Sequence, residues 1–235
     1  MQDFAESLAL AWRLILAGDA DLWAIVALSL QVSLSAVVLA CLIGLPLGAV
    51  VGAFRFPGRG LLGVVFNALM GLPPVVVGLA LYLLLSRAGP LGELGLLYTP
   101  TAMVLAQTVL VTPIVAALCR QVVEDLHLEY DEQLRSLGVG PLATLATLLW
   151  DARYSLLTAA LAGFGRAIAE VGAVIIVGGN INHVTRVMTT TIALETSKGN
   201  LALALALGLI LIGLALIVNG AVMALRHTAR GAAYA

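Results

Sequence analysis

Five long apolar runs take up most of this chain of 235 residues. They cover residues 23–53, 61–85, 101–118, 155–177 and 201–225. A helix of roughly 20 apolar residues crosses the hydrocarbon core of a bilayer, and each run approaches or exceeds that length. A helix satisfies its own backbone hydrogen bonds in lipid, whereas a β-barrel needs short alternating strands, which this sequence lacks. The pattern predicts an all-α membrane protein with five transmembrane helices.

The composition agrees with this prediction, because 61% of the residues are hydrophobic and only 11% are charged. Soluble domains carry about 25% charged residues. The 12 lysines and arginines are scattered and the net charge is -1, so no basic tract for nucleic acid is present. The two cysteines and three histidines lack the spacing of metal ligands, and we expect no metal site.

A separate amphipathic segment precedes the first apolar run. Its apolar side chains recur at three- and four-residue spacing within residues 3–17, which predicts a helix lying in the membrane interface. The members of the repeat are Phe4, Leu8, Trp12 and Ile15. Gly18 is expected to end this helix, and Asp19 or Asp21 to cap the next one. We therefore divide the chain into an N-terminal segment (1–22), a membrane domain (23–226) and a cytoplasmic tail (227–235).

The distribution of cations predicts the orientation. With five spans and the polar segment after the third on the cytoplasmic side, the N-terminus lies outside and the C-terminus inside. Seven arginines then lie inside: Arg55, Arg59, Arg120, Arg135, Arg153, Arg226 and Arg230. Four cations lie outside: Arg13, Arg87, Arg186 and Lys198. The excess of positive charge on the inner side favours this orientation.

Prolines and polar residues interrupt the apolar runs. Pro46, the pair Pro73-Pro74, and Pro113 are expected to break the first, second and third helices, because proline removes a backbone hydrogen bond. Broken helices are common around transport paths, but each proline is also compatible with a packing kink.

Polar side chains within the spans have two interpretations. Ser29 and Ser33 lie one turn apart in the first run, and Gln107, Thr108 and Thr112 lie in the third. They could line or gate a path for a polar solute, or form hydrogen bonds between helices.

The fourth run holds the two intramembrane charges. Arg166 and Glu170 are four residues apart, so they share a helix face and can pair. Ionisable groups at this depth face the bundle interior or water. They either hold or gate the bundle as a neutral pair, or present a cation to an anionic solute. Gly163, Gly165 and Gly172 nearby indicate close helix packing.

The segment between the fourth and fifth runs, residues 178–200, is too long for a simple turn. Residues 188–194 are expected to form a short helix against the bundle. Arg186, Glu195 and Lys198 are candidates for contact with an external partner, although a solvated loop is equally compatible with the pattern.

Catalysis by this chain is not expected. Its one lysine, Lys198, is not preceded by the glycine pattern of a phosphate-binding loop, and no nucleophile elbow or metal-binding histidine pair is present. The chain should therefore not hydrolyse ATP by itself, and we expect no cofactor on it.

A polar segment of about twenty residues, 129–151, separates the third and fourth runs. An acidic residue stands six positions before a glycine, and a short amphipathic helix is expected to end there. The residues concerned are Glu129, Glu132, Leu134, Arg135, Leu137 and Gly138. This pattern resembles the loop of ABC-transporter permeases that docks onto a separate ATPase. It departs from that motif with Gln133-Leu134 in place of two alanines, and with Trp150-Asp151 in place of Leu-Pro.

A wider resemblance covers residues 29–225. Residues 165–181, GRAIAEVGAVIIVGGNI, are similar to the matching stretch of type I ABC importer permeases for tetrahedral oxyanions. Residues 185–199, TRVMTTTIALETSKG, resemble most closely the tungstate branch of these permeases. Molybdate, sulfate or another small solute remains an alternative substrate, and a secondary transporter is the alternative of a different class.

The resemblance implies the rest of the assembly. It implies two permease copies in a prokaryotic inner membrane, two cytoplasmic ATPases that carry ATP and magnesium, and an extracytoplasmic solute-binding protein. It also implies a five-helix core in which residues 129–138 form the coupling helix. Transport would follow by alternating access, with the permease forming the path.

Overall fold

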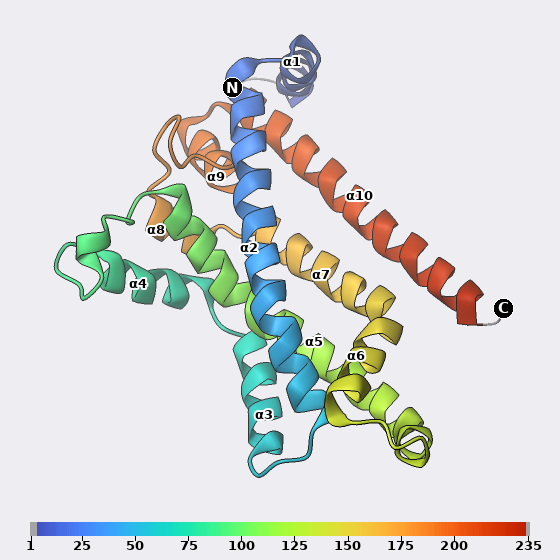
Figure 1. The fold of residues 1–235 in the computed structure, drawn as a ribbon. Coiled ribbons are helices and arrows are strands. Elements are labelled where there is room, and N and C mark those ends of the chain that lie inside the picture. The colour runs from blue at the N-terminus through green and yellow to red at the C-terminus, as the bar shows by residue number, and fades with distance from the viewer. Residues whose placement is uncertain (1–3, 234–235) are drawn as a thin grey trace. The chain divides into compact units, whose positions relative to one another are not determined.

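The computed structural model describes the backbone of residues 4–233 and the side chains of residues 5–224 (Figure 1). Every element within this part of the chain is helical. In chain order they are α1 (Phe4–Ala17), α2 (Ala20–Ala53), α3 (Arg59–Met70), α4 (Pro74–Leu85), η1 (Gly92–Leu94), α5 (Pro100–Ser136), α6 (Pro141–Asp151), α7 (Arg153–Ile168), α8 (Gly172–Gly178), α9 (Met188–Lys198) and α10 (Leu201–Ala233).

The long apolar helices confirm the predicted fold class. Three of the described helices, α2, α5 and α10, are long and apolar enough to cross a membrane unbroken. Two pairs pass the same test together but are bent: α3 with α4 by 97°, and α7 with α8 by 59°. Counting each bent pair as one span gives five, the number expected from the apolar runs.

The chain divides into two compact units. Unit 1 contains residues up to Ala36, Pro73–Gln107 and Gly165–Val218. Here the short helix α8 packs along α4 (Figure 1). A Cβ added at Gly78 of α4 would lie 2.8 Å from the Ala173 Cα of α8, so glycine permits this close approach.

Unit 2 contains Val37–Leu72, Thr108–Phe164 and the chain from Asn219 onward. Small side chains of α2 and α5 allow these helices to approach closely, and α6 and α7 complete the packing. The buried core cluster consists of Ala49, Ala53, Cys119, Val123, Leu148, Ala152 and Leu156.

Glycines on α2 produce this close packing and lead to a stability prediction. A Cβ at Gly48 would overlap the Ala116 carbonyl oxygen and lie 2.8 Å from the Cys119 Cβ. Displacing the backbone of a packed helix costs free energy, so Gly48→Ala should lower the free energy of unfolding by about 1–3 kcal/mol. The control is Gly213→Ala on α10, where nothing lies within 4 Å of the added Cβ. It should be stabilising by about 0.5–1 kcal/mol through helix propensity. Thermal unfolding in detergent or nanodiscs measures both changes, and equal effects would contradict the prediction.

Only one of the three helix breaks that the prolines predicted is present in the described residues. Only Pro73-Pro74 separates two helices, whereas α2 continues through Pro46 and α5 through Pro113. A single proline deletes one hydrogen bond, which a long apolar helix tolerates. At the end of α3, Gly71 and the restriction that a proline places on the preceding residue act together, so the chain turns there.

The third and fourth runs also differ from their predicted form. The third run was expected to be the shortest span, but it belongs to the 37-residue helix α5, which continues through the acidic segment to Ser136. No glycine or proline lies between Leu118 and Ser136, and pairs such as Arg120–Glu124 support the helix. The fourth run was expected to be continuous, but it is broken between Ile168 and Gly172.

The N-terminal helix α1 ends at Ala17, and Gly18 follows with φ 67°, as expected. The Asp19 carboxylate accepts a hydrogen bond from Leu22 N at 2.9 Å, so Asp19 is the cap of α2. Leu8 and Trp12 of the apolar repeat are exposed, whereas Ser7 and Ala11 are fully buried. Asp3, the Phe4 side chain, residues 234–235 and the side chains of Arg226 and Arg230 lie outside the described part.

Candidate functional site

The break in the fourth apolar run, residues 169–171 in unit 1, is surrounded by side chains that bind backbone carbonyls within it and just before it. Gln107 of α5 donates its Nε2 to the Ala167 carbonyl at 3.0 Å. Thr189 of α9 donates its hydroxyl to the Glu170 carbonyl at 2.8 Å. Backbone groups freed inside a bilayer need such partners, because lipid offers none. Side chains from two other helices therefore stabilise the break.

Glu170 and Arg166 form the predicted ion pair, with Arg166 Nη1 donating to Glu170 Oε2. The pair does not lie on one continuous helix, because α7 ends at Ile168. The other oxygen, Glu170 Oε1, accepts from Ala173 N at 3.2 Å in the first turn of α8. The Glu170 side chain is 4% exposed and that of Arg166 is 37% exposed. Glu170 thus pairs with a cation and caps a helix, while part of the Arg166 side chain stays accessible.

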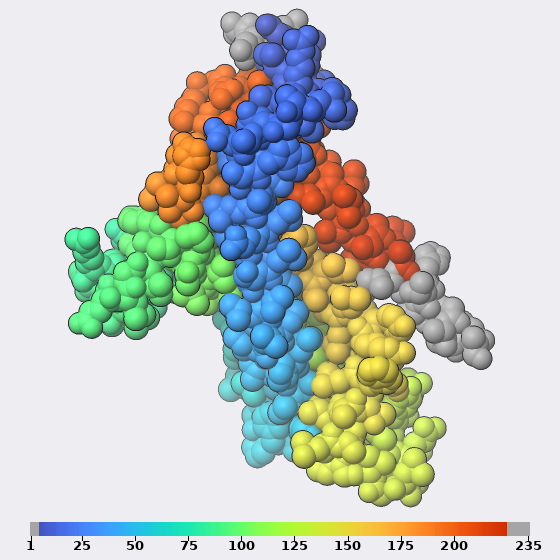
Figure 2. Space-filling view, turned by 45° about the horizontal axis from the view of Figure 1, so that its top comes forward, coloured from blue at the N-terminus to red at the C-terminus, as the bar shows by residue number. Residues whose placement is uncertain are grey.

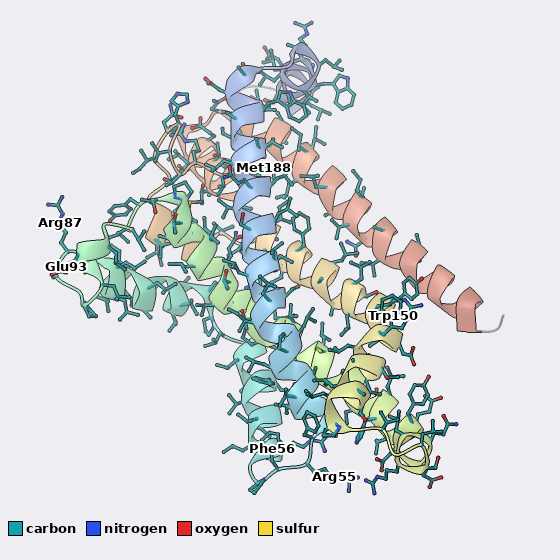
Figure 3. The ribbon with its side chains drawn as sticks, viewed as in Figure 1. Arg55, Phe56, Arg87, Glu93, Trp150 and Met188 are labelled. Atoms are coloured by element: carbon teal, nitrogen blue, oxygen red, sulfur yellow. The ribbon has the colours of Figure 1, made fainter. Side chains whose placement is uncertain are left out.

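The predicted polar residues of the first and third runs have distinct positions. Ser29 Oγ accepts from Met188 N at 2.8 Å and so fixes the start of α9 against α2. Figure 3 places Met188 where α9 meets α2, and Figure 2 shows residues near 190 in orange against the blue start of α2. Gln107 belongs to unit 1, whereas Thr108 and Thr112 belong to unit 2. The Thr112 hydroxyl donates to the Thr108 carbonyl at 2.7 Å within α5. Ser29 and Gln107 therefore act as hydrogen-bond links between helices.

The polar segment after the third span, in unit 2, forms the last turns of α5 and a tight turn into α6. Gly138 has φ 67° and ends the helix: Gly138 N donates to the Arg135 carbonyl, and Val139 N to the Leu134 carbonyl, each at 3.0 Å. Pro141 then begins α6. Among the six predicted residues, Leu134 is half-buried and Glu129, Glu132, Arg135, Leu137 and Gly138 are exposed.

Two exposed leucines interrupt the otherwise polar surface of this turn. Leu137 is 77% exposed and Leu142 is 81% exposed. They flank the turn between α5 and α6, and Trp150, 69% exposed, lies farther along α6 (Figure 3). Exposed apolar side chains next to charged ones are typical of a protein interface. We call the exposed residues 129–142 the coupling surface, after the role that the sequence analysis predicts for this segment.

An ion-pair cluster that the sequence analysis missed supports the base of the coupling surface. Glu124 of α5 contacts Arg59 at 2.9 Å and Arg120 at 2.7 Å. Arg59 also donates to the carbonyls of Val51 and Gly52, at 2.8 and 3.0 Å, and so caps the end of α2. The Arg120–Glu124 spacing was visible in the sequence, but the participation of Arg59 depends on tertiary packing. The cluster ties α2, α3 and α5 together within unit 2.

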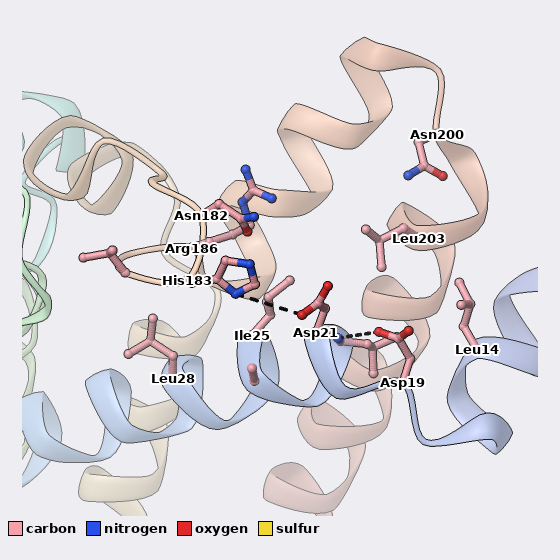
Figure 4. A pocket seen from close by; sticks show the side chains of 13 residues that line it. Leu14, Asp19, Asp21, Ile25, Leu28, Asn182, His183, Arg186, Asn200 and Leu203 are labelled. Atoms are coloured by element: carbon pink, nitrogen blue, oxygen red, sulfur yellow. Dashed lines mark hydrogen bonds and ion pairs between the residues drawn. The ribbon is translucent and has the colours of Figure 1, made fainter.

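A cavity of about 510 Å³ lies in unit 1, between the corner of α1 and α2, residues 182–186 and the start of α10 (Figure 4). Its floor is apolar, with Leu22, Ile25 and Leu203 among the lining residues. Its polar lining residues are Asp19, Asp21, Asn182, His183, Arg186 and Asn200. His183 Nδ1 lies 4.0 Å from Asp21 Oδ1. The lining carries acidic and basic side chains above an apolar floor, a combination that can bind a side chain of a partner protein. We call this cavity the outer pocket, because the predicted orientation puts these residues on the outer side.

The three predicted partner contacts are not equally accessible. Arg186 lines the outer pocket and Lys198 is 51% exposed, whereas Glu195 is buried. Glu195 accepts from Lys198 Nζ and Asn200 Nδ2, each at 2.9 Å. It therefore holds together the end of α9 and the start of α10.

Glu195 also gives a pH prediction. The hydrogen bond from Lys198 lowers the pKa of Glu195 from its ordinary value of 4.5. A carboxyl group with a lowered folded-state pKa stabilises the fold above its unfolded-state pKa, and this contribution is lost as pH falls through the folded-state pKa. Glu195→Gln should therefore lower the melting temperature at pH 7, and the difference from the unmodified protein should shrink toward pH 4. The exposed Glu93 offers a control as Glu93→Gln. An undiminished difference at pH 4 would contradict the assignment.

The chain matches known transport proteins over most of its length. The profile of the binding-protein-dependent transport system inner membrane component family matches residues 44–230. The tungstate uptake system permease protein TupB of Peptoclostridium acidaminophilum is 38% identical over 227 residues, which are 97% of this chain and 100% of that protein. A probable anion ABC transporter permease protein of Haloferax volcanii is 42% identical, over 83% of this chain and 86% of that protein. TupB of Campylobacter jejuni is 39% identical, over 74% and 73%. The chain therefore belongs to this family, the inner-membrane permease subunits of type I ABC importers.

Proposed function

We propose that this chain forms the translocation path of an ATP-driven importer for a tetrahedral oxyanion, with tungstate as the first candidate. The observation that carries the proposal is the similarity to a tungstate uptake permease along 97% of the chain. A probable anion permease at 42% identity supports the substrate class. Molybdate and sulfate share the tetrahedral shape and charge of tungstate, so they are the alternatives within this class.

The coupling surface links ATP hydrolysis by the partner to movement of the membrane helices. A cytoplasmic ATPase binds the exposed residues Glu129, Glu132, Arg135, Leu137 and Gly138, with the half-buried Leu134 supporting them. ATP and magnesium act on that partner, and this chain does not hydrolyse ATP. Closure of two ATPases moves the coupling surfaces of two permease copies, and the membrane helices alternate between inward-open and outward-open states.

Arg166 is the candidate contact for the oxyanion or for the gate. Its side chain is 37% exposed even though it pairs with Glu170. A guanidinium half-neutralised by a carboxylate attracts a dianion weakly, and a transport path needs weak sites because tight ones trap the solute. Thr108 and Thr112 of α5 are further candidates for lining the path. Gln107 and Glu170 position this region.

The extracytoplasmic solute-binding protein contacts Arg186, Lys198 and the outer pocket. Glu195, being buried, supports this surface by fixing Lys198. The arrangement requires that the N-terminus lies outside the cytoplasm and the C-terminus inside, as the distribution of arginine and lysine favours. The division into residues 1–22, 23–226 and 227–235 follows the same topology.

Stimulation of the ATPase tests the substrate class. The permease is assembled with its ATPase in nanodiscs, and ATP hydrolysis is measured with the binding protein alone or loaded with tungstate, molybdate or sulfate. We expect tungstate-loaded protein to stimulate most. Stimulation by molybdate or sulfate alone would make that oxyanion the substrate in place of tungstate. Stimulation by none of the three would overturn the oxyanion assignment.

A further inference from the structure

A small polar cavity lies beside the break in the fourth span, within unit 1. Its volume is about 10 Å³, and it is lined by Ser29, Val32, Ser33, Gln107, Ile168, Glu170, Val187 and Thr189. The five polar side chains among these are all at least nine-tenths buried, with exposures between 2% for Ser33 and 8% for Thr189. Polar side chains from α2, α5, the break and α9 therefore converge on one small space.

One acceptor in this cavity is unsatisfied by the described protein groups. The Gln107 amide must direct its NH₂ group to the Ala167 carbonyl, 3.0 Å away, because a carbonyl can only accept. This contact fixes the orientation of the amide. The other end, Gln107 Oε1, is buried, and no donor among the described residues reaches it. A buried acceptor without a donor is costly, most of all in a bilayer.

The remaining groups do not supply that donor. The Ser29 hydroxyl donates to the Ile25 carbonyl at 2.7 Å, and the Thr189 hydroxyl donates to the Glu170 carbonyl. Ser33 brings a further hydroxyl to the cavity from one turn farther along α2. A small occupant that both donates and accepts would satisfy Gln107 and Ser33 together.

Size and charge decide the nature of the occupant. About 10 Å³ is close to the room that one water molecule needs, and water requires two to four polar partners. A tetrahedral oxyanion has five heavy atoms and does not fit. Arg166 already balances the charge of Glu170, so a cation would leave an excess positive charge in a buried site. A neutral occupant is therefore favoured.

We propose that this cavity holds one ordered water molecule, which donates a hydrogen bond to Gln107 Oε1 and accepts one from the Ser33 hydroxyl. The water completes the hydrogen bonding of the break and links α2 to α5 beside it. Gln107 and Ser33 therefore belong to a buried hydrogen-bond network that stabilises the break. They do not line the path of the oxyanion. The water does not depend on which solute is carried, so its absence would leave the transport proposal intact.

A structure of the permease–ATPase complex in lipid, at a resolution that shows ordered water, tests the proposal directly. We expect a density peak within hydrogen-bond distance of both Gln107 Oε1 and Ser33 Oγ. A cavity without density, a cation with shorter oxygen distances, or a Gln107 amide turned the other way would each overturn it. The structure of the unsubstituted complex decides the question even if a variant fails to fold.

Ser33→Val gives a second test in solution, because its methyl groups displace the water and leave Gln107 without a donor. We expect the melting temperature to fall by about 2–10 °C. The matched control is Ser35→Val, an exposed serine two residues along the same helix, which should change it little. In a cycle with Gln107→Leu, the combined shift should be smaller than the sum, because one water serves both side chains. Additive shifts would contradict a shared water.

Discussion

Leu137→Asp is expected to weaken assembly with the ATPase strongly while leaving the membrane fold intact. Leu137 is 77% exposed in the turn after α5, so the substitution disturbs little within this chain. Burying a leucine against a partner contributes about 1.5–3 kcal/mol, and an aspartate there would also bury an unpaired charge. Because about 1.4 kcal/mol corresponds to a factor of ten, the affinity for the ATPase should fall at least about tenfold to a hundredfold. Titration of the ATPase onto nanodiscs that hold the permease measures this change.

A matched substitution separates the coupling surface from general effects of charge. Leu94→Asp introduces the same side chain at a leucine that is 60% exposed, at the end of η1 in the loop between α4 and α5. This loop lies on the opposite side of the membrane in the proposed topology, so ATPase affinity should be unchanged. Equal loss of affinity in both variants, or in neither, would rule out residues 129–142 as the docking surface.

Arg166→Met is expected to cause the largest loss of stability among substitutions in the membrane helices. It leaves the Glu170 carboxylate, 4% exposed, without its cation. Removing one partner of a buried ion pair costs about 3–5 kcal/mol. Glu170→Met should cost less through charge, because Arg166 is 37% exposed, but it also removes the cap on Ala173 N. The double variant should recover part of the stability, because no unpaired charge remains.

The exposed pair of Arg135 and Asp131 provides the control for this experiment. It has the same four-residue spacing, but the Arg135 side chain is 70% exposed. An exposed pair contributes up to about 1 kcal/mol, so Arg135→Met should change the free energy of unfolding by no more than that. Chemical unfolding in detergent compares the two. If Arg166→Met costs no more than Arg135→Met, the ion pair does not hold the break together.

Much of the fold could be predicted from local pattern. Hydropathy placed the cores of α2 and α10, and the Asp19 cap and the Gly18 stop follow from local rules of helix ends. The start of α9 at Met188 was also expected from its composition. These features depend on residues close to one another in the chain.

The break in the fourth run could not be predicted in this way. No proline marks residues 169–171, and Gly172 beside them indicated only close helix packing. The helix α7 ends where Gln107, 60 positions earlier, binds the Ala167 carbonyl. Conversely, Pro46 and Pro113 suggested breaks that the packed helices do not make. The end of the polar helix at Gly138 was predicted from local pattern, but local charge alone did not show that this helix continues unbroken from Pro100.

Uptake into proteoliposomes tests the central claim most directly. The permease and its ATPase are reconstituted with ATP on the cytoplasmic face, and the loaded binding protein is added on the other face. The proposed function predicts that tungstate accumulates only when ATP and the binding protein are both present, and that Leu137→Asp abolishes accumulation. Uptake driven by an ion gradient, without the ATPase, would contradict it and identify the chain as a secondary transporter.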